Sequence, residues 1–306
     1  MGNITLPPEY ALLDPKDPEG QILSYRTVSD ASICIMSLMK ESKKTTSWDF
    51  DAHLIFQMCN LKSISILSLA NGIGYEHPEK KYSMINFSDP FSIFTIIRSQ
   101  FESYCNFNNI YIQSKSVEEI KLKYDLWVLA GLLNRQKYSI GEFQELKEKK
   151  AKELEQIERI KADIISNKIF QNLDQNSREL IVDWKRLSSD WKLVIDGQNG
   201  RYKGWHDLMI NTGTGKAFDN AYRFLSLSTH PSNVSVFQFN HLYVAKEEQF
   251  YKRMALNFSK WILSFFIRDF VIHFGLQNKL QGELPELNRK LIGLYNTELR
   301  SKDYAF

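Results

Sequence analysis

Cysteine is scarce in this chain of 306 residues, and proline is missing from its central part. The three cysteines, Cys34, Cys59 and Cys105, are widely spaced and odd in number, which argues against a disulfide framework and favours buried thiols in a reducing compartment. Of the eight prolines, four precede residue 19 and none falls between residues 91 and 230. Because proline inside a helix costs about 3 kcal/mol, this stretch is free to form long helices.

Long apolar runs are also missing. The most apolar run, residues 261–267, ends at Arg268 and Asp269, far short of the roughly 20 residues that span a bilayer. The first ten residues, MGNITLPPEY, contain neither the basic region nor the apolar region of a signal peptide. Leu6 stands where a myristoylation signal requires Ser or Thr. We therefore expect a cytoplasmic protein with no membrane association.

What the chain does contain is an ordinary share of hydrophobic residues, 43%, and of charged residues, 25%. Aromatic residues reach 13%, so we expect Phe, Tyr and Trp to supply much of the buried area. The formal net charge is only +3. That balance neither requires a nucleic-acid partner nor excludes one, because a local basic patch is sufficient.

Apolar periodicity and capping signals predict an all-α fold, a multi-helix bundle. We expect an extended N-terminal arm over residues 1–24 and a single helical domain over 25–306, with a charged helical arm at about 142–172. Residues around 234–239 fit either one short strand or a structured loop. The helices are expected over residues 29–39, 47–71, 90–112, 116–137, 142–165, 174–193, 214–228, 247–274 and 284–299.

The segment 142–165 is rich in Glu and Lys. Its apolar stripe thins to Leu154, Ile157, Ile160 and Ile164, which indicates a projecting helix or half of a helical hairpin, exposed on most of its circumference. Because acids and bases alternate, a solvated face is favoured over an RNA-binding strip. The same helix is a candidate surface for a protein partner.

Standard motifs for cofactors and metals are missing. Gly213-Thr-Gly-Lys216 resembles part of a phosphate loop, but Ile210 and Ala217 replace the glycine and the hydroxyl residue that such a loop requires. Asp49, Asp51 and His53 fit the first turns of a helix better than a metal site. No nucleophile elbow, Rossmann fingerprint or kinase set is present. We expect no metal and no cofactor.

Two polar features remain on otherwise apolar helices. Arg98 and Glu102 are four residues apart and share a helix face, so they form either an internal ion pair or part of a polar site. Arg223 and His230 are seven residues apart, about two helical turns, so their side chains point the same way. The alternative for His230 is a helix cap ahead of Pro231.

The segments IIRSQFESYCNFNNIY and YRFLSLSTHPS resemble a family of bacterial all-helical proteins related to HEPN domains. The likeness extends over roughly residues 50–275. HEPN ribonucleases carry an arginine and a histidine separated by four to six residues, and Arg223 and His230 match the longest spacing. Phe224 follows the arginine, where HEPN nucleases usually carry a polar residue. The resemblance implies a HEPN-like core, a homodimer and RNA as the substrate.

A second arginine–histidine pair, Arg268 and His273, also fits that spacing and has a polar residue, Asp269, after the arginine. A separation of five residues, however, places the two side chains about 140° apart around a helix. We therefore rank this pair second.

Metal-independent RNA cleavage requires a group that moves protons near neutral pH and a cation that binds the phosphate. Histidine suits the first role and arginine the second. By resemblance, His230 is the acid and base and Arg223 the phosphate ligand, in an endoribonuclease acting as a toxin or a phage-defence effector. Arg98 or Glu102 would orient them, and Tyr222 and Ser226 supply nearby hydroxyls. The alternative is a non-catalytic helical module that senses a nucleotide or binds a protein partner.

Overall fold

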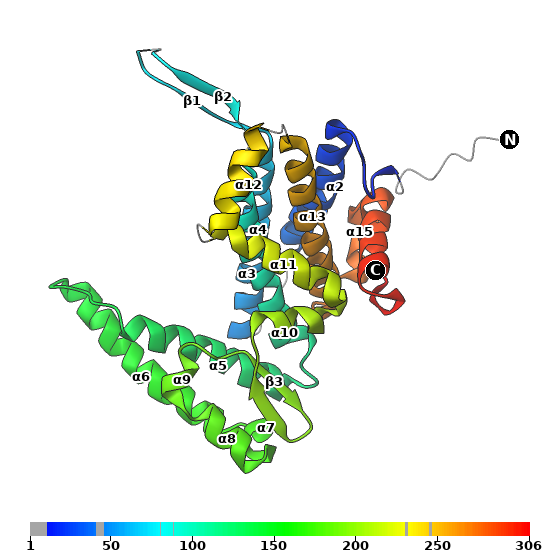
Figure 1. The fold of residues 1–306 in the computed structure, drawn as a ribbon. Coiled ribbons are helices and arrows are strands. Elements are labelled where there is room, and N and C mark those ends of the chain that lie inside the picture. Colours follow the sequence, from blue (N-terminus) through cyan, green and yellow to red (C-terminus); the bar gives the residue numbers. More distant parts are fainter. Residues whose placement is uncertain (1–10, 41–45, 80, 88, 230–231, 245–246) are drawn as a thin grey trace. The chain divides into compact units, whose positions relative to one another are not determined.

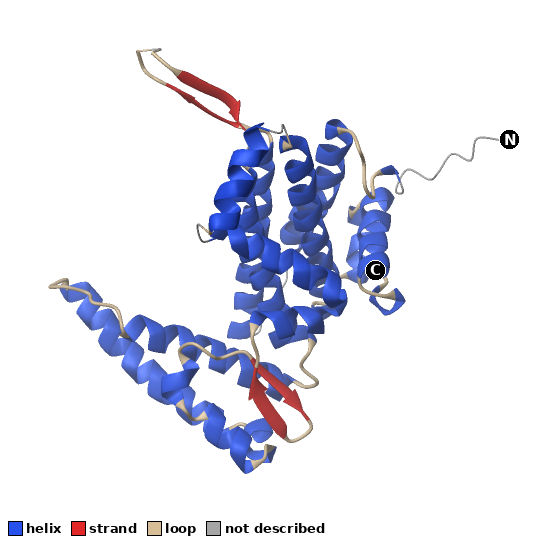
Figure 2. Cartoon of the chain, viewed as in Figure 1, coloured by secondary structure: helices blue, strands red, loops and turns tan. Residues whose placement is uncertain are grey.

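The computed structural model describes residues 11–40, 46–79, 81–87, 89–229, 232–244 and 247–306. The described residues are mostly helical, and their strands form two separate two-stranded hairpins, so the predicted all-α fold is confirmed (Figure 2). The chain divides into two compact units, residues 1–105 with 209–306 and residues 106–208. The sequence had predicted one domain with a charged arm.

The first unit is a helical bundle around α13 (Glu248–His273), which packs against α2 (Pro18–Lys40), α3 (Ser47–Ala70) and α15 (Glu286–Leu299) (Figure 1). As expected from its apolar surface, α13 is the most deeply buried of these helices, and Phe265, Phe266 and Phe270 are fully buried on it. The ring of Phe56 on α3 stacks on Phe270 at 4.2 Å. The other elements of this unit are α4 (Pro90–Phe107), η2 (Ile210–Thr214), α11 (Gly215–Thr229), α12 (Asn233–Val244), α14 (Gln277–Glu283), η3 (Lys302–Tyr304) and the hairpin β1 (Ile73–Glu76) with β2 (Ser83–Phe87). Helix α10 (Trp205–Met209) lies at the boundary, with residues 205–208 in the second unit.

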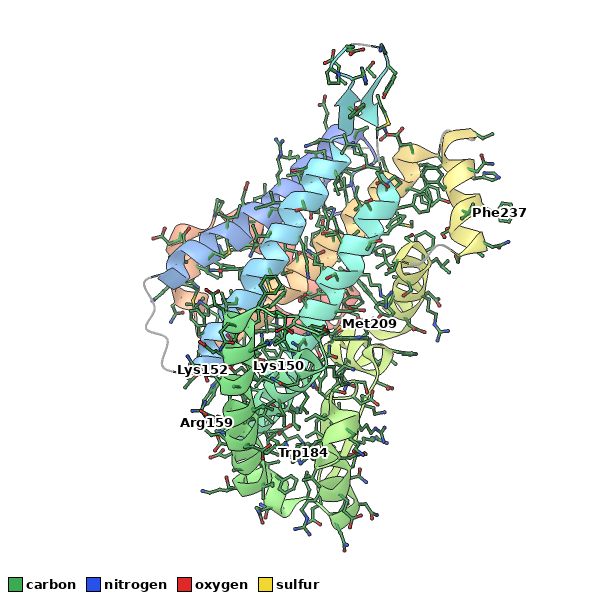
Figure 3. The ribbon with its side chains drawn as sticks, turned by 90° about the vertical axis from the view of Figure 1, so that its left-hand side faces the viewer. Lys150, Lys152, Arg159, Trp184, Met209 and Phe237 are labelled. Atoms are coloured by element: carbon green, nitrogen blue, oxygen red, sulfur yellow. The ribbon has the colours of Figure 1, made fainter. Side chains whose placement is uncertain are left out.

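The second unit is built on an antiparallel pair of helices, α5 (Val117–Gln136) and α6 (Gln144–Ser166). The predicted charged helix is therefore half of a helical hairpin. Its buried stripe contains Ile157, Ile160 and Ile164, as expected, but Glu153 is buried and Leu154 is 53% exposed. Figure 3 labels Lys150, Lys152 and Arg159 along α6. The unit is completed by η1 (Asn108–Ile112), α7 (Lys168–Asn172), α8 (Gln175–Ile181), α9 (Trp184–Leu187) and the hairpin β3 (Leu193–Asp196) with β4 (Asn199–Tyr202).

Three segments differ from the sequence prediction. Helix α2 begins at Pro18, so residues 18–24 are helical where an extended arm was expected. Residues 174–193 are not one helix, because Asp174 caps α8 and Asp183 caps a separate helix, α9. Residues 234–239 are neither strand nor loop but part of α12, in which the Ser232 hydroxyl accepts the amide hydrogen of Ser235 at 3.1 Å.

Candidate functional site

Helix α11 carries three of the predicted site residues, and its start depends on glycine. Gly213 has a φ of 85°, a conformation that residues with a Cβ adopt only at a cost. A Cβ at this position would lie 2.7 Å from the ring of Tyr304. The close approach of the chain to Tyr304 therefore requires glycine, and it fixes the position from which α11 begins.

Arg98 and Glu102 on α4 form an ion pair, and both residues are hydrogen-bonded to Tyr222 on α11. Nε of Arg98 donates to Oε1 of Glu102 at 3.2 Å, and the Tyr222 hydroxyl donates to the same oxygen at 2.7 Å. Nη2 of Arg98 donates to the Tyr222 hydroxyl at 3.3 Å, and its guanidinium lies 5.2 Å from the centre of the tyrosine ring. The sequence predicted that Arg98 and Glu102 share a face, and the structure adds Tyr222 as their common partner. We call these three residues the α4–α11 cluster.

The cluster is partly buried, with the Arg98 side chain 22% and the Glu102 side chain 26% exposed. Burial, followed by the hydrogen bond to Glu102, raises the pKa of Tyr222 to about 12. Burial alone would lower the pKa of Arg98, but Tyr222 and Glu102 outweigh it and the pKa is raised. Tyr222 therefore stays neutral and Arg98 stays charged at neutral pH. The cluster suits the positioning of α11 against α4 rather than proton transfer.

Arg223 follows Tyr222 on α11, so it projects about 100° away from the α4–α11 cluster. Its Nε lies 3.2 Å from Oδ1 of Asp219, one turn earlier, and its side chain is 69% exposed. The Ser226 hydroxyl donates to the backbone carbonyl of Tyr222 at 2.7 Å, which is a common arrangement for serine within a helix. His230 lies outside the described residues.

The second-choice pair, Arg268 and His273, lies on α13. Arg268 donates to Asp269 at 3.1 Å and to the Asp303 carbonyl at 3.2 Å, and its guanidinium lies 5.0 Å from the Tyr304 ring centre. His273, by contrast, packs edge-on against Phe274 at 4.7 Å, and burial lowers its pKa. The two side chains therefore have different surroundings, as their separation on one continuous helix predicts.

A buried ion pair near Arg268 went unnoticed in the sequence. Asp269 and Arg300 have fully buried side chains, with Nη1 of Arg300 3.0 Å from Oδ1 of Asp269. The Tyr104 hydroxyl donates to the other oxygen of Asp269 at 2.8 Å, and Nε of Arg300 donates to the Thr212 carbonyl at 2.7 Å. The two partners are 31 positions apart in sequence, so no local signal predicts their contact. This pair connects α13, α15 and η2 inside the first unit.

The described part of the chain has neither a metal-binding group nor a membrane-spanning helix. Among the residues that the structure describes, no group of three or more His, Cys, Asp and Glu side chains could hold a metal ion. None of the described helices combines the length and the apolar character needed to cross a bilayer.

Comparison of the chain with protein-family models, with curated proteins and with solved structures gives no match. The function of the chain is therefore inferred from its own side chains.

Proposed function

We propose that the chain is a HEPN-like, metal-independent endoribonuclease that acts as a homodimer, in the role of a toxin or a phage-defence effector. The observation that supports this function best is the placement of Arg223. It is a mostly exposed guanidinium on a helix whose adjacent residue, Tyr222, is held by two charged side chains of α4. A fixed helix with an accessible arginine suits the binding of a phosphodiester.

In the proposed reaction the ribose 2′-hydroxyl attacks the neighbouring phosphorus and the bond from phosphorus to the 5′-oxygen breaks. His230 takes the proton of the 2′-hydroxyl and returns a proton to the leaving 5′-oxygen. Arg223 binds the non-bridging phosphate oxygens, whose negative charge grows in the transition state. Asp219 competes for the same guanidinium, so a phosphate must displace it. The Arg223 side chain is 69% exposed, whereas that of Asp219 is 17% exposed, so a phosphate can reach the guanidinium from the solvent side.

The test is cleavage of a labelled RNA in EDTA by the wild type and by variants. His230→Ala is expected to abolish cleavage, and Arg223→Gln to slow it about 100-fold or more, as the loss of one donor to a transition-state oxyanion does. Arg223→Lys is also expected to be impaired, because lysine keeps the charge but loses the paired donors.

Arg186→Gln is a matched control, since Arg186 is also paired with an aspartate four residues away, Asp190, at 3.3 Å. This variant is expected to cleave RNA at the wild-type rate. Unchanged cleavage in the Arg223 and His230 variants, or no cleavage by the wild type, would refute the proposed function.

The alternative, a non-catalytic module that binds a protein partner, is supported by the tip of the α5–α6 hairpin. A hollow of about 480 Å³ there is lined by Lys149, Lys150 and the Arg135–Glu153 ion pair together with apolar side chains, so the two lysines give it a positive charge. Tyr138 is 57% and Phe143 71% exposed beside it. Such a surface fits an acidic segment that carries one large apolar side chain.

An anisotropy titration with a labelled acidic peptide containing a central leucine tests this alternative. Binding that weakens with salt and is lost in Phe143→Ser would support the module, whereas no saturable binding would count against it.

A further inference from the structure

A second pocket lies in the first unit, between the end of α13, α14 and α15. Its volume is about 380 Å³, within the range of about 300–1,000 Å³ that is usual for small-molecule sites. It is lined by Val271, Gln277, Leu280, Gln281, Glu286, Arg289, Lys290, Gly293 and Phe306. None of these residues belongs to the α4–α11 cluster or its surroundings.

The polar side of the pocket has one unsatisfied donor. Glu286 and Lys290 form an ion pair with each other at 3.0 Å, so their charges balance. Nε of Arg289 is shielded from solvent and has no hydrogen-bond partner among the described residues. A buried donor without an acceptor is unfavourable. Arg289 lines the pocket and forms no ion pair among the described residues, so an anionic ligand there would balance its charge.

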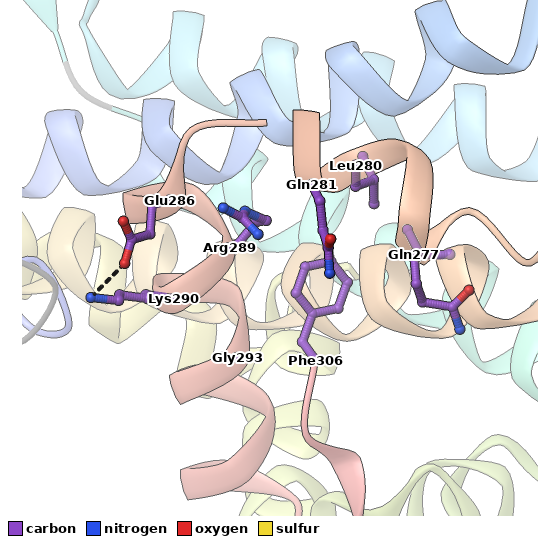
Figure 4. Close-up of a pocket in the computed structure, with 9 residues that line it drawn as sticks. Gln277, Leu280, Gln281, Glu286, Arg289, Lys290, Gly293 and Phe306 are labelled. Carbon is purple, nitrogen blue, oxygen red and sulfur yellow. Dashed lines mark ion pairs between the residues drawn. The ribbon is translucent and has the colours of Figure 1, made fainter. Parts of the chain in front are cut away.

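The remaining lining residues indicate which other chemical groups the ligand carries. Gln277 and Gln281 each present a donor and an acceptor, whereas Val271 and Leu280 form apolar walls. Figure 4 shows Arg289, Gln281 and the ring of Phe306 around the same space. The Phe306 side chain is 37% exposed, so a flat ring can pack against it.

We propose that this pocket binds a small organic oxyanion that carries a flat ring, with its charge on Arg289 and its ring against Phe306. A phosphate on a nucleobase-containing ligand and a carboxylate on an aromatic ring both have this chemistry. The site is independent of the proposed RNA cleavage, because Arg289 lies on α15 and the proposed catalytic residues lie on and just after α11.

The experiment is calorimetric titration of the full chain with four probes: adenosine 5′-monophosphate, indole-3-acetate, adenosine and inorganic phosphate. Saturable binding of either ring-bearing anion is expected, and which one binds identifies the source of the oxyanion. Adenosine and inorganic phosphate, each of which has one of the two features, are expected to bind at least about tenfold more weakly.

Two variants place the binding in this pocket. Arg289→Gln removes the charge and is expected to weaken binding by about tenfold or more. Gly293→Leu is expected to fill the pocket, because a Cβ at Gly293 has room, with its nearest neighbour 3.8 Å away on Phe306. Gly282→Leu is the matched control, since Gly282 is exposed on α14 and has no atom within 4 Å of its Cβ position.

Binding by a ring-bearing anion that is lost in Arg289→Gln and Gly293→Leu and kept in Gly282→Leu supports the proposal. No saturable binding of either anion, equal binding of adenosine, or binding unchanged in Arg289→Gln would overturn it. RNA cleavage measured in the same variants is expected to stay at the wild-type rate, so failure of this site is distinguishable from failure of the nuclease.

Discussion

Lys260, on the central helix α13, is the residue whose burial has the clearest energetic consequence. Its side chain is among the largest that are fully buried, at 1% exposure. Nζ donates to the Ser24 hydroxyl at 2.9 Å and lies 5.1 Å from the centre of the Tyr295 ring. Asp14, whose negative charge acts on Lys260, is hydrogen-bonded to Arg253. An ammonium group in these surroundings is poorly compensated.

Burial lowers the pKa of Lys260 to about 7 from 10.5, an effect that Asp14 partly opposes and Arg253 adds to. Between these two values the unfolded chain binds more protons at this position than the folded chain does. Stability therefore rises with pH across the window from about 7 to 10.5. The two values differ by about 3.5 pH units, which corresponds to on the order of 5 kcal/mol if the whole difference acts on folding.

The assay is urea unfolding of the wild type and of Lys260→Met at pH 7, 8 and 9. Methionine keeps the length of the side chain and removes its charge. The free energy of unfolding of the wild type, minus that of the variant, is expected to rise by about 1 kcal/mol for each pH unit. The comparison is necessary because burial also raises the pKa of Cys59, which gives both proteins the opposite pH dependence. If the difference between the two proteins stays constant from pH 7 to 9, Lys260 is not a buried neutral amine and the reasoning is wrong.

Three further predictions concern stability. Arg300→Gln removes one of the two guanidinium groups that pair with the fully buried Asp269 and leaves Arg268 as the other, so we expect a loss of about 3 kcal/mol in urea unfolding, the lower end for a broken buried pair; a loss below 1 kcal/mol would contradict the buried ion pair. Gly213→Ala places a Cβ against Tyr304 at positive φ and is expected to cost more than about 1 kcal/mol in the same assay. Lys149→Glu with Lys152→Glu changes two exposed side chains of α6, so the melting temperature is expected to stay nearly constant, and loss of folding would refute the assignment of this face to solvent.

The helices were predictable where short capping signals and apolar periodicity agreed. The Ser116 hydroxyl accepts the amide hydrogen of Glu119 at 3.2 Å, as the Ser-x-x-Glu spacing at the start of α5 predicts. Glu119 in turn accepts the amide hydrogen of Lys115 at 3.0 Å, one residue before the position that a standard capping box uses. Likewise, Asp89 accepts the amide hydrogen of Ser92 at 3.1 Å ahead of α4.

The two β-hairpins were not predicted, because their strands have only four or five residues. Such strands are too short for apolar alternation to stand out. The second hairpin has a two-residue loop, Gly197-Gln198, between the paired Asp196 and Asn199, and the glycine at its first position has the positive φ, 60°, that such tight turns require.

The polar site was predictable only within single helices. The Arg98–Glu102 pair follows from a spacing of four residues, whereas the contact of both residues with Tyr222 joins positions more than 100 apart in sequence. The same limit applies to Asp269 and Arg300, which meet only because α13 packs against α15. Local spacing identifies which residues share a face, and only tertiary packing determines what that face contacts.

This distinction determines which arginine is available to bind a ligand. Arg300 uses Nε, Nη1 and Nη2 within the protein, so it has a structural role despite its strong charge. Arg98 is likewise committed to Glu102 and Tyr222. Arg223 has a largely exposed guanidinium, and Arg289 has a buried Nε with no acceptor among the described residues. The spacing between an arginine and a histidine does not distinguish a structural arginine from one that is available to a ligand. The partners of each guanidinium make that distinction. For that reason the RNA and small-ligand proposals are assigned to Arg223 and Arg289.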